Sequence, residues 1–137
     1  MDNRFDVLID SFLLSQVGID NNFLSNRLCT GLQQHVLQLQ KDNQMNFAGI
    51  GNNVVKDKQQ KMRGDKIYWL DKSHENEFEK EFLNCIEEFI AHLNETCYTG
   101  INAYEFHYAV YEAGSFYKRH KDQFKNDSSR KFSLINY

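Results

Sequence analysis

Two residue types that bind transition metals stand two positions apart near the end of the chain, as His120 and Asp122. They follow an aromatic segment, Phe116 to Arg119, which we interpret as a short strand. A neutral imidazole beside a hard carboxylate leaves the opposite face of a metal ion open, as in non-haem iron sites. A strand end would fix both side chains in place. The pair therefore predicts part of a metal site.

Two other interpretations of this segment remain open. An H-x-D pattern arises by chance roughly one time in three in such a chain, and K-R-H-K-D also reads as a solvated charged turn. Basic and aromatic residues are mixed here, as in nucleic-acid modules, but Asp122 and Asp127 interrupt the patch. The net charge of −3 gives no general attraction to nucleic acid or anionic lipid. We therefore expect no nucleic-acid partner and no membrane partner.

The composition predicts one globular domain, spanning 1–137. Apolar residues make up 41% of the chain and aromatic residues 14%, which is ample for a core. No apolar run approaches the length of a membrane span, and the first residues lack the apolar stretch of a signal peptide. The three cysteines are widely spaced with no C-x-x-C pair, so we expect reduced, mostly buried thiols in a cytoplasmic protein.

Hydrophobic periodicity predicts helices backed by a sheet, an α+β class. Apolar spacings of three and four predict helices over Asn22 to Lys41, capped by Asp20 or Asn21, and over Ser73 to Asn94. From Ala103 the period changes to two, with Tyr104, Phe106, Tyr108 and Val110 on one face of a strand. The remaining expected elements are a short strand at Val7 to Ile9, a loop from Asn43 to Gln60, and strands at Met62 to Leu70, Phe116 to Arg119 and Lys131 to Tyr137.

Several separated blocks of the chain resemble the Fe(II)- and 2-oxoglutarate-dependent prolyl 4-hydroxylases. The resemblance is greatest to the oxygen-sensing branch of this family and its bacterial relatives. The blocks are R-G-D-K-I-Y-W-L, the helix after it, V-Y-E-A-G-S-F-Y-K-R-H-K-D and R-K-F-S-L-I-N-Y. They occur in order over most of Phe5 to Tyr137. The resemblance implies N-terminal helices packed on a double-stranded β-helix, or jelly roll, of which this chain holds the first half.

The resemblance also implies roles for individual residues. His120 and Asp122 match two members of the 2-His-1-carboxylate iron triad, and Tyr117 falls on an aromatic near the iron. Tyr111 matches a tyrosine of the 2-oxoglutarate pocket, and Tyr137 matches one that bonds the distal carboxylate of 2-oxoglutarate. For each tyrosine, core packing is the alternative.

Four further assignments complete the predicted site. His107 shares a strand face with Tyr111 and is expected either to line the same pocket or to be a partly buried structural histidine. Asp65 and Arg130 are expected to form an ion pair at the rim of the active-site mouth, with Arg63 on the same rim; two unrelated solvated charges are the alternative. His35, His74 and His92 are expected to be surface or packing residues.

The family's third iron ligand and the basic residue that grips 2-oxoglutarate would lie past Tyr137, so we expect the domain to be incomplete at its C-terminus. The function implied is a dioxygenase that hydroxylates a C–H bond with Fe(II), dioxygen and 2-oxoglutarate, and with ascorbate as a reductant. Its substrate is a peptidyl proline, another peptide group or a small molecule. The 137 residues alone are expected to be inactive. The alternative is an inactive remnant that binds a protein; the oligomeric state stays open.

Overall fold

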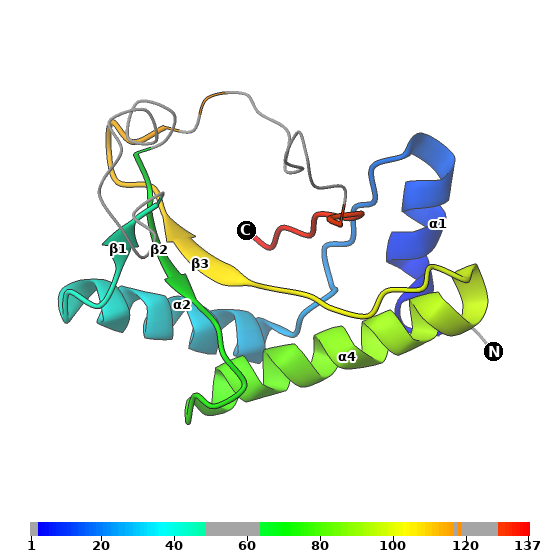
Figure 1. Ribbon diagram of the computed structural model, residues 1–137, viewed down its shortest axis with the longest axis horizontal. Coiled ribbons are helices and arrows are strands. Elements are labelled where there is room, and N and C mark those ends of the chain that lie inside the picture. The colour runs from blue at the N-terminus through cyan, green and yellow to red at the C-terminus, as the bar shows by residue number, and fades with distance from the viewer. Residues whose placement is uncertain (1–2, 49–63, 117, 119–128) are drawn as a thin grey trace. The chain divides into compact units, whose positions relative to one another are not determined.

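The computed structural model describes residues 3–48, 64–116, 118 and 129–137. Contacts between residues divide the chain into two compact units, and each is described by itself. The first unit comprises Met1–Asn46 and Ile67–Ala109, and the second comprises Phe47–Lys66 and Val110–Tyr137. The described helices all belong to the first unit (Figure 1).

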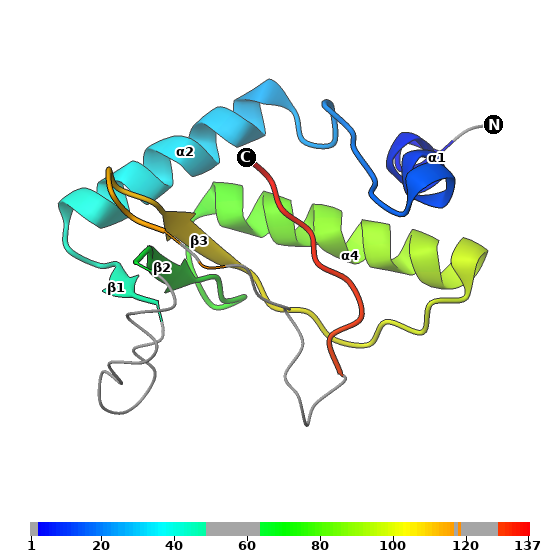
Figure 2. The same cartoon turned by 90° about the horizontal axis from the view of Figure 1, so that it is seen from above.

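Two amphipathic helices pack against each other in the first unit. Helix α2 spans Asn26–Lys41 and helix α4 spans Glu77–Cys97, and they lie side by side in both views (Figures 1 and 2). Gly31 of α2 is buried, and its missing side chain leaves room for the ring of Phe78. The two helices predicted from apolar spacing are therefore confirmed, and their apolar faces bury Leu28 and Leu39 of α2 and Phe82, Leu83 and Ile86 of α4.

Helices α2 and α4 each begin at a side-chain cap. Ser25 Oγ accepts a hydrogen bond from the backbone N–H of Leu28, and Asn76 Oδ1 accepts from two backbone N–H groups of the first turn of α4. The predicted cap of α2 at Asp20 or Asn21 is wrong, because the Asp20 carboxylate instead accepts from the N–H two residues later and makes a turn.

Another described helix, α1, spans Asp6–Ser15, so the strand predicted over Val7–Ile9 is wrong. Two short apolar runs separated by two polar residues also fit a helix whose neighbours lie four apart. The helix is anchored at its start, where Phe5 packs against Phe89 of α4 and Asp6 lies 3.0 Å from His92. Figure 2 shows α1 beside the C-terminal part of α4.

Within the described residues, three short strands form one sheet in the order β1-β2-β3. They are β1 (Asn46–Phe47), β2 (Lys66–Trp69) and β3 (His107–Val110). The strand predicted at Met62–Leu70 is confirmed over a shorter span, and its first two residues lie outside the described residues. Likewise, β1 interrupts the predicted loop at 43–60. The mixture of helices and sheet confirms the α+β class, whereas the described strands are too few to establish the predicted jelly roll.

In the second unit, the N–H of Gly64 donates to the carbonyl of Phe116 at 2.6 Å, and Lys66 pairs with Glu112 at 3.6 Å. The described residues 129–137 contain no helix or strand, so the strand predicted at Lys131–Tyr137 is not observed. Phe116 and Lys118 are not in a strand either, and the rest of that predicted strand lies outside the described residues. A strand requires a neighbouring backbone to pair with, and period-two alternation alone does not supply one.

The core of the first unit consists of apolar side chains of α2 and α4 together with residues that precede the helices. Its members Phe5, Leu24, Leu28, Phe82 and Ile86 are each at least nine-tenths buried. Within the described residues, no helix is both long enough and apolar enough to cross a membrane.

Candidate functional site

The predicted iron ligands lie outside the part of the chain that the structure describes. His120 and Asp122 belong to the segment 119–128, and Tyr117 and Arg63 are also not described. Among the described residues, no three His, Cys, Asp or Glu side chains are arranged to hold a metal ion. The assignment of His120 and Asp122 as iron ligands therefore stays a prediction. The structure describes the helices and strands that precede these residues in the chain.

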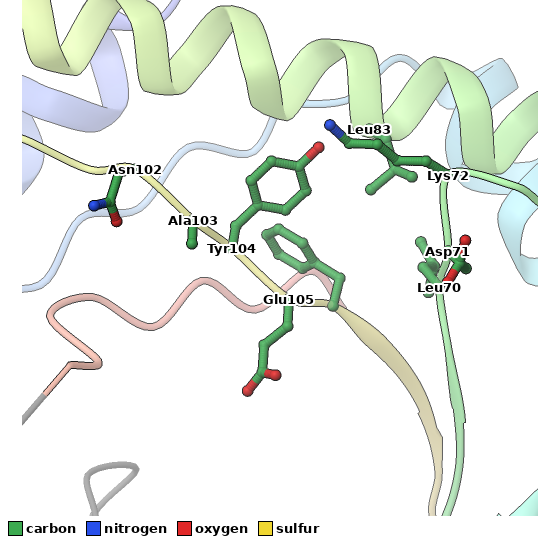
Figure 3. Close-up of a pocket in the computed structure, with 9 residues that line it drawn as sticks. Leu70, Asp71, Lys72, Leu83, Asn102, Ala103, Tyr104 and Glu105 are labelled. Atoms are coloured by element: carbon green, nitrogen blue, oxygen red, sulfur yellow. The ribbon is translucent and has the colours of Figure 1, made fainter. Parts of the chain in front are cut away.

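Strand β3 presents alternate residues to different surroundings, as the period of two predicts. His107 and Ala109 are exposed, whereas Tyr108 and Val110 are partly buried. The alternation extends upstream: Tyr104 points toward α4 and Glu105 points the other way (Figure 3). On the exposed face, the His107 ring packs edge-on against Trp69 of β2, with ring centroids 4.8 Å apart. His107 is therefore accessible on the sheet face opposite to that of Tyr108, and its place in a pocket stays a prediction.

The other predicted site residues lie in the second unit. Tyr111 directly follows β3 and is half exposed, and Tyr137 is fully exposed. Asp65 is completely buried, whereas Arg130 is exposed. Asp65 is thus not a solvated surface charge, and a buried carboxylate requires hydrogen bonds or a cation. The Asp65–Arg130 pair and the contacts of both tyrosines with 2-oxoglutarate stay predictions.

A surface depression of about 430 Å³ lies where the extended segment before β3 passes the end of β2 (Figure 3). At its edge, Lys72 Nζ lies 2.6 Å from Glu87 Oε1, and the Tyr104 hydroxyl donates to the same oxygen at 2.9 Å. The hydrogen bond from Lys72 lowers the pKa of Glu87, and Glu87 in turn raises the pKa of Lys72. This polar network ties the segment before β3 to α4.

One buried polar cluster was not anticipated from the sequence. Glu79 of α4 is 1% exposed, and its Oε2 lies 3.4 Å from Nδ1 of His74 and 3.6 Å from Nε2 of His35. The rings of Tyr68 and Tyr108 complete the cluster, since Tyr68 packs against His74 and Tyr108 packs against His35. A signal was present in the sequence: Glu79 lies three and seven positions before Phe82 and Ile86, on the same apolar stripe.

The cysteines of the chain are free, as predicted, but the expectation that they are mostly buried is wrong: Cys85 is buried, Cys29 is intermediate and Cys97 is exposed. Arg4 donates a hydrogen bond to the Cys85 sulfur at 2.8 Å. Burial raises the pKa of the Cys85 thiol, and the nearby guanidinium only partly opposes this effect. A buried thiol with a raised pKa is expected to react slowly.

Comparison with solved structures finds matches that show what the chain resembles. One of them is the crystal structure of a Pseudomonas putida prolyl-4-hydroxylase, which matches with a TM-score of 0.76 and 24% sequence identity. The two chains share one fold. The match covers 88% of this chain but 62% of the hydroxylase chain, so the chain spans less than two thirds of that enzyme's length. No family model and no curated protein matches the sequence.

At 24% identity the likeness concerns the fold alone. It agrees with the resemblance drawn from the sequence blocks, which likewise covers most of Phe5 to Tyr137. The helices α2 and α4 and the sheet thus belong to a fold shared with that prolyl-4-hydroxylase, and a shared fold does not by itself assign a function.

Proposed function

We propose that the chain is part of a dioxygenase that uses Fe(II) and 2-oxoglutarate to hydroxylate a C–H bond. One observation carries the proposal: an H-x-D pair, His120 and Asp122, follows the last described strand of a chain whose fold is shared with a prolyl-4-hydroxylase. The motif alone is weak, and the fold alone supports many chemistries. Their occurrence together in one chain is what favours this function.

The donor set fits Fe(II). A neutral imidazole and a carboxylate are suitable ligands for non-haem iron, and a facial arrangement leaves coordination positions open. His120 and Asp122 would hold the metal, and a further ligand would have to come from elsewhere. When bound, iron and 2-oxoglutarate supply the oxidising power, with dioxygen as co-substrate and succinate as a product. This chain's residues supply the binding geometry.

The proposed roles of the other residues come from the resemblance to the prolyl 4-hydroxylases. Tyrosine hydroxyls at 111 and 137 would donate hydrogen bonds to the carboxylates of 2-oxoglutarate, and both side chains are accessible in the described structure. His107 is exposed beside Trp69 and would line the same pocket. Tyr117 would pack near the metal.

The proposed substrate is a prolyl group in a peptide, because the matched structure is a prolyl-4-hydroxylase. Asp65, Arg130 and Arg63 would handle the substrate at the rim of the site. Ascorbate as a reductant is part of the same proposal.

The test measures metal binding and activity separately. Anaerobic Fe(II) is titrated into the 137-residue chain, and paramagnetic broadening of its NMR signals reports even weak binding. We expect broadening near residues 111–122 that is lost in His120→Ala and in Asp122→Ala. Lys121→Ala is the matched control, since Lys121 lies between the two ligands and carries no metal-binding group at neutral pH.

Activity is measured as succinate formation from 2-oxoglutarate in a protein expressed from the complete reading frame, with a proline-containing peptide as substrate. The same two alanine variants are expected to abolish it. Iron binding that persists undiminished in His120→Ala would refute the ligand assignment.

A further inference from the structure

Helix α1 carries an apolar face that the structure leaves exposed. Six of its ten residues are apolar, yet none of the ten is buried. Leu14 is 88% exposed, Leu13 72% and Val7 61%. Single exposed apolar side chains are ordinary, but a group of them on one short helix indicates a surface that another molecule can cover.

The loop that follows α1 extends this surface and is held against the helix. Ser15 Oγ donates a hydrogen bond to the carbonyl of Val17, and Ser11 Oγ accepts one from the N–H of Ile19. Gly18 lies so close to the helix that a Cβ atom there would come within 2.8 Å of a backbone carbonyl oxygen of α1. Val17 and Ile19 are therefore fixed beside α1 with exposed side chains. We call Val7, Leu13, Leu14, Val17 and Ile19 the α1 patch.

One carboxylate lies among the apolar residues of the α1 patch. Val7, Asp10 and Leu14 follow one another at spacings of three and four, so their side chains share one face of the helix. Asp10 is exposed, and within the described residues its carboxylate makes no hydrogen bond or ion pair. The other carboxylate of α1, that of Asp6, lies 3.0 Å from His92. Asp10 is therefore the charge that a partner of this face has to match.

The charges around the α1 patch favour a basic partner over the other candidates. Residues 5–26 contain three aspartates and no lysine or arginine, whereas helices that lie on membranes carry basic residues that face anionic lipid. Pairing of the patch with a second copy of itself about a twofold axis would bring two Asp10 carboxylates near each other. A partner with a lysine or arginine gains an ion pair instead. Apolar residues at spacings of three and four also form the kind of surface on which a second helix packs.

We propose that the α1 patch binds an amphipathic helix whose apolar face carries one lysine or arginine opposite Asp10. Apolar contact supplies most of the affinity, because binding removes the exposed side chains of the patch from water. The charge pair adds less to the affinity and decides which partner is accepted. The patch belongs to the first unit alone, and the inference is independent of the proposed enzymatic function.

The test uses two synthetic helical peptides that are identical except at one position. Each carries a stripe of leucines, with a lysine at its centre in one peptide and a glutamate in the other. Each peptide is titrated into the isotope-labelled 137-residue chain, and binding is followed by NMR. We expect shifts confined to the signals of residues around the α1 patch, and roughly fivefold tighter binding of the lysine peptide. In Asp10→Lys this preference should reverse, whereas Glu77→Lys changes an exposed acid of α4 outside the patch and should leave the preference unchanged.

The apolar part of the α1 patch is tested by Leu14→Ser, which should weaken the binding of both peptides about tenfold. The comparison of the two peptides needs only the unmodified chain, so it decides the matter even if a variant does not fold. Equal affinity of the two peptides for the unmodified chain, or no binding of either, would overturn the proposal.

Three other results would assign the α1 patch to a different occupant and so overturn the proposal. Binding of the chain to phosphatidylserine vesicles that is lost in Leu14→Ser would assign the patch to a membrane. A dimer in sedimentation that is lost in Leu14→Ser would assign it to a second copy of the chain. In a protein expressed from the complete reading frame, shielding of Leu13 and Leu14 from a soluble paramagnetic agent would assign it to another part of the same polypeptide.

Discussion

Replacing Gly31 by alanine should destabilise the protein, although alanine is the better helix former. A Cβ built on Gly31 would lie 2.5 Å from Cγ of Phe78, far inside the usual contact distance of roughly 3.5–4.0 Å. The ring cannot simply turn away, because Cγ is fixed one bond from the Cβ atom on α4. Relief requires α2 and α4 to move apart, or a strained rotamer at Phe78.

Two opposing terms give the expected magnitude. Alanine gains about 1 kcal/mol over glycine in a helix interior, whereas forcing atoms into a packed interface costs about 1–3 kcal/mol. Because the approach is so short, we expect the upper part of that range and a net loss of about 1–2 kcal/mol. In urea this loss corresponds to a midpoint lower by about 0.5–1 M.

The assay is urea unfolding monitored by circular dichroism, with Thr30→Ala as the matched control. Thr30 is exposed on the same helix, so its replacement tests helix propensity without a clash. Shortening the ring in a Gly31→Ala, Phe78→Leu double variant should recover part of the loss. A Gly31→Ala variant as stable as the unmodified chain would show that the helices do not approach this closely.

Two further outcomes are expected from other described contacts. Asn94→Ala removes three hydrogen bonds to residues 99–101 and should cost about 2–3 kcal/mol in urea unfolding, whereas exposed Asn84→Ala should change little; equal effects would contradict the role of Asn94. In thiol labelling at pH 8, exposed Cys97 should react first and Cys85 last, because burial raises the pKa of Cys85; peptide mapping that finds Cys85 modified first would contradict this order.

Local sequence patterns were sufficient to predict the elements in which the hydrophobic periodicity extends over many residues. The stripe of apolar residues in α4 repeats over several turns, and the alternation over 104–111 continues for eight residues, so each pattern allows one regular structure. The short runs at 7–9 and 131–137 were assigned wrongly because a few apolar residues fit a helix, a strand or neither. In such runs, the tertiary partner decides the conformation.

In the candidate site, too, some features could be predicted from a local pattern and others could not. H-x-D is a local motif, so His120 and Asp122 could be chosen from the sequence, although their geometry lies outside the described residues. The Glu79 cluster could not be assembled in advance. His35, His74 and Glu79 come from different segments, and their sequence separations carry no information about a shared carboxylate oxygen.

The sequence by itself determined the α+β class, the two long helices and the inward and outward faces of the strand that leads to Tyr111, because each depends on periodicity within one segment. Only the tertiary structure decided that Gly31 receives the Phe78 ring, that Asp65 is buried, and that Glu79 lies between two imidazoles. Those features depend on which segments meet, and the free energy of burial is set by neighbours that lie far away in the chain.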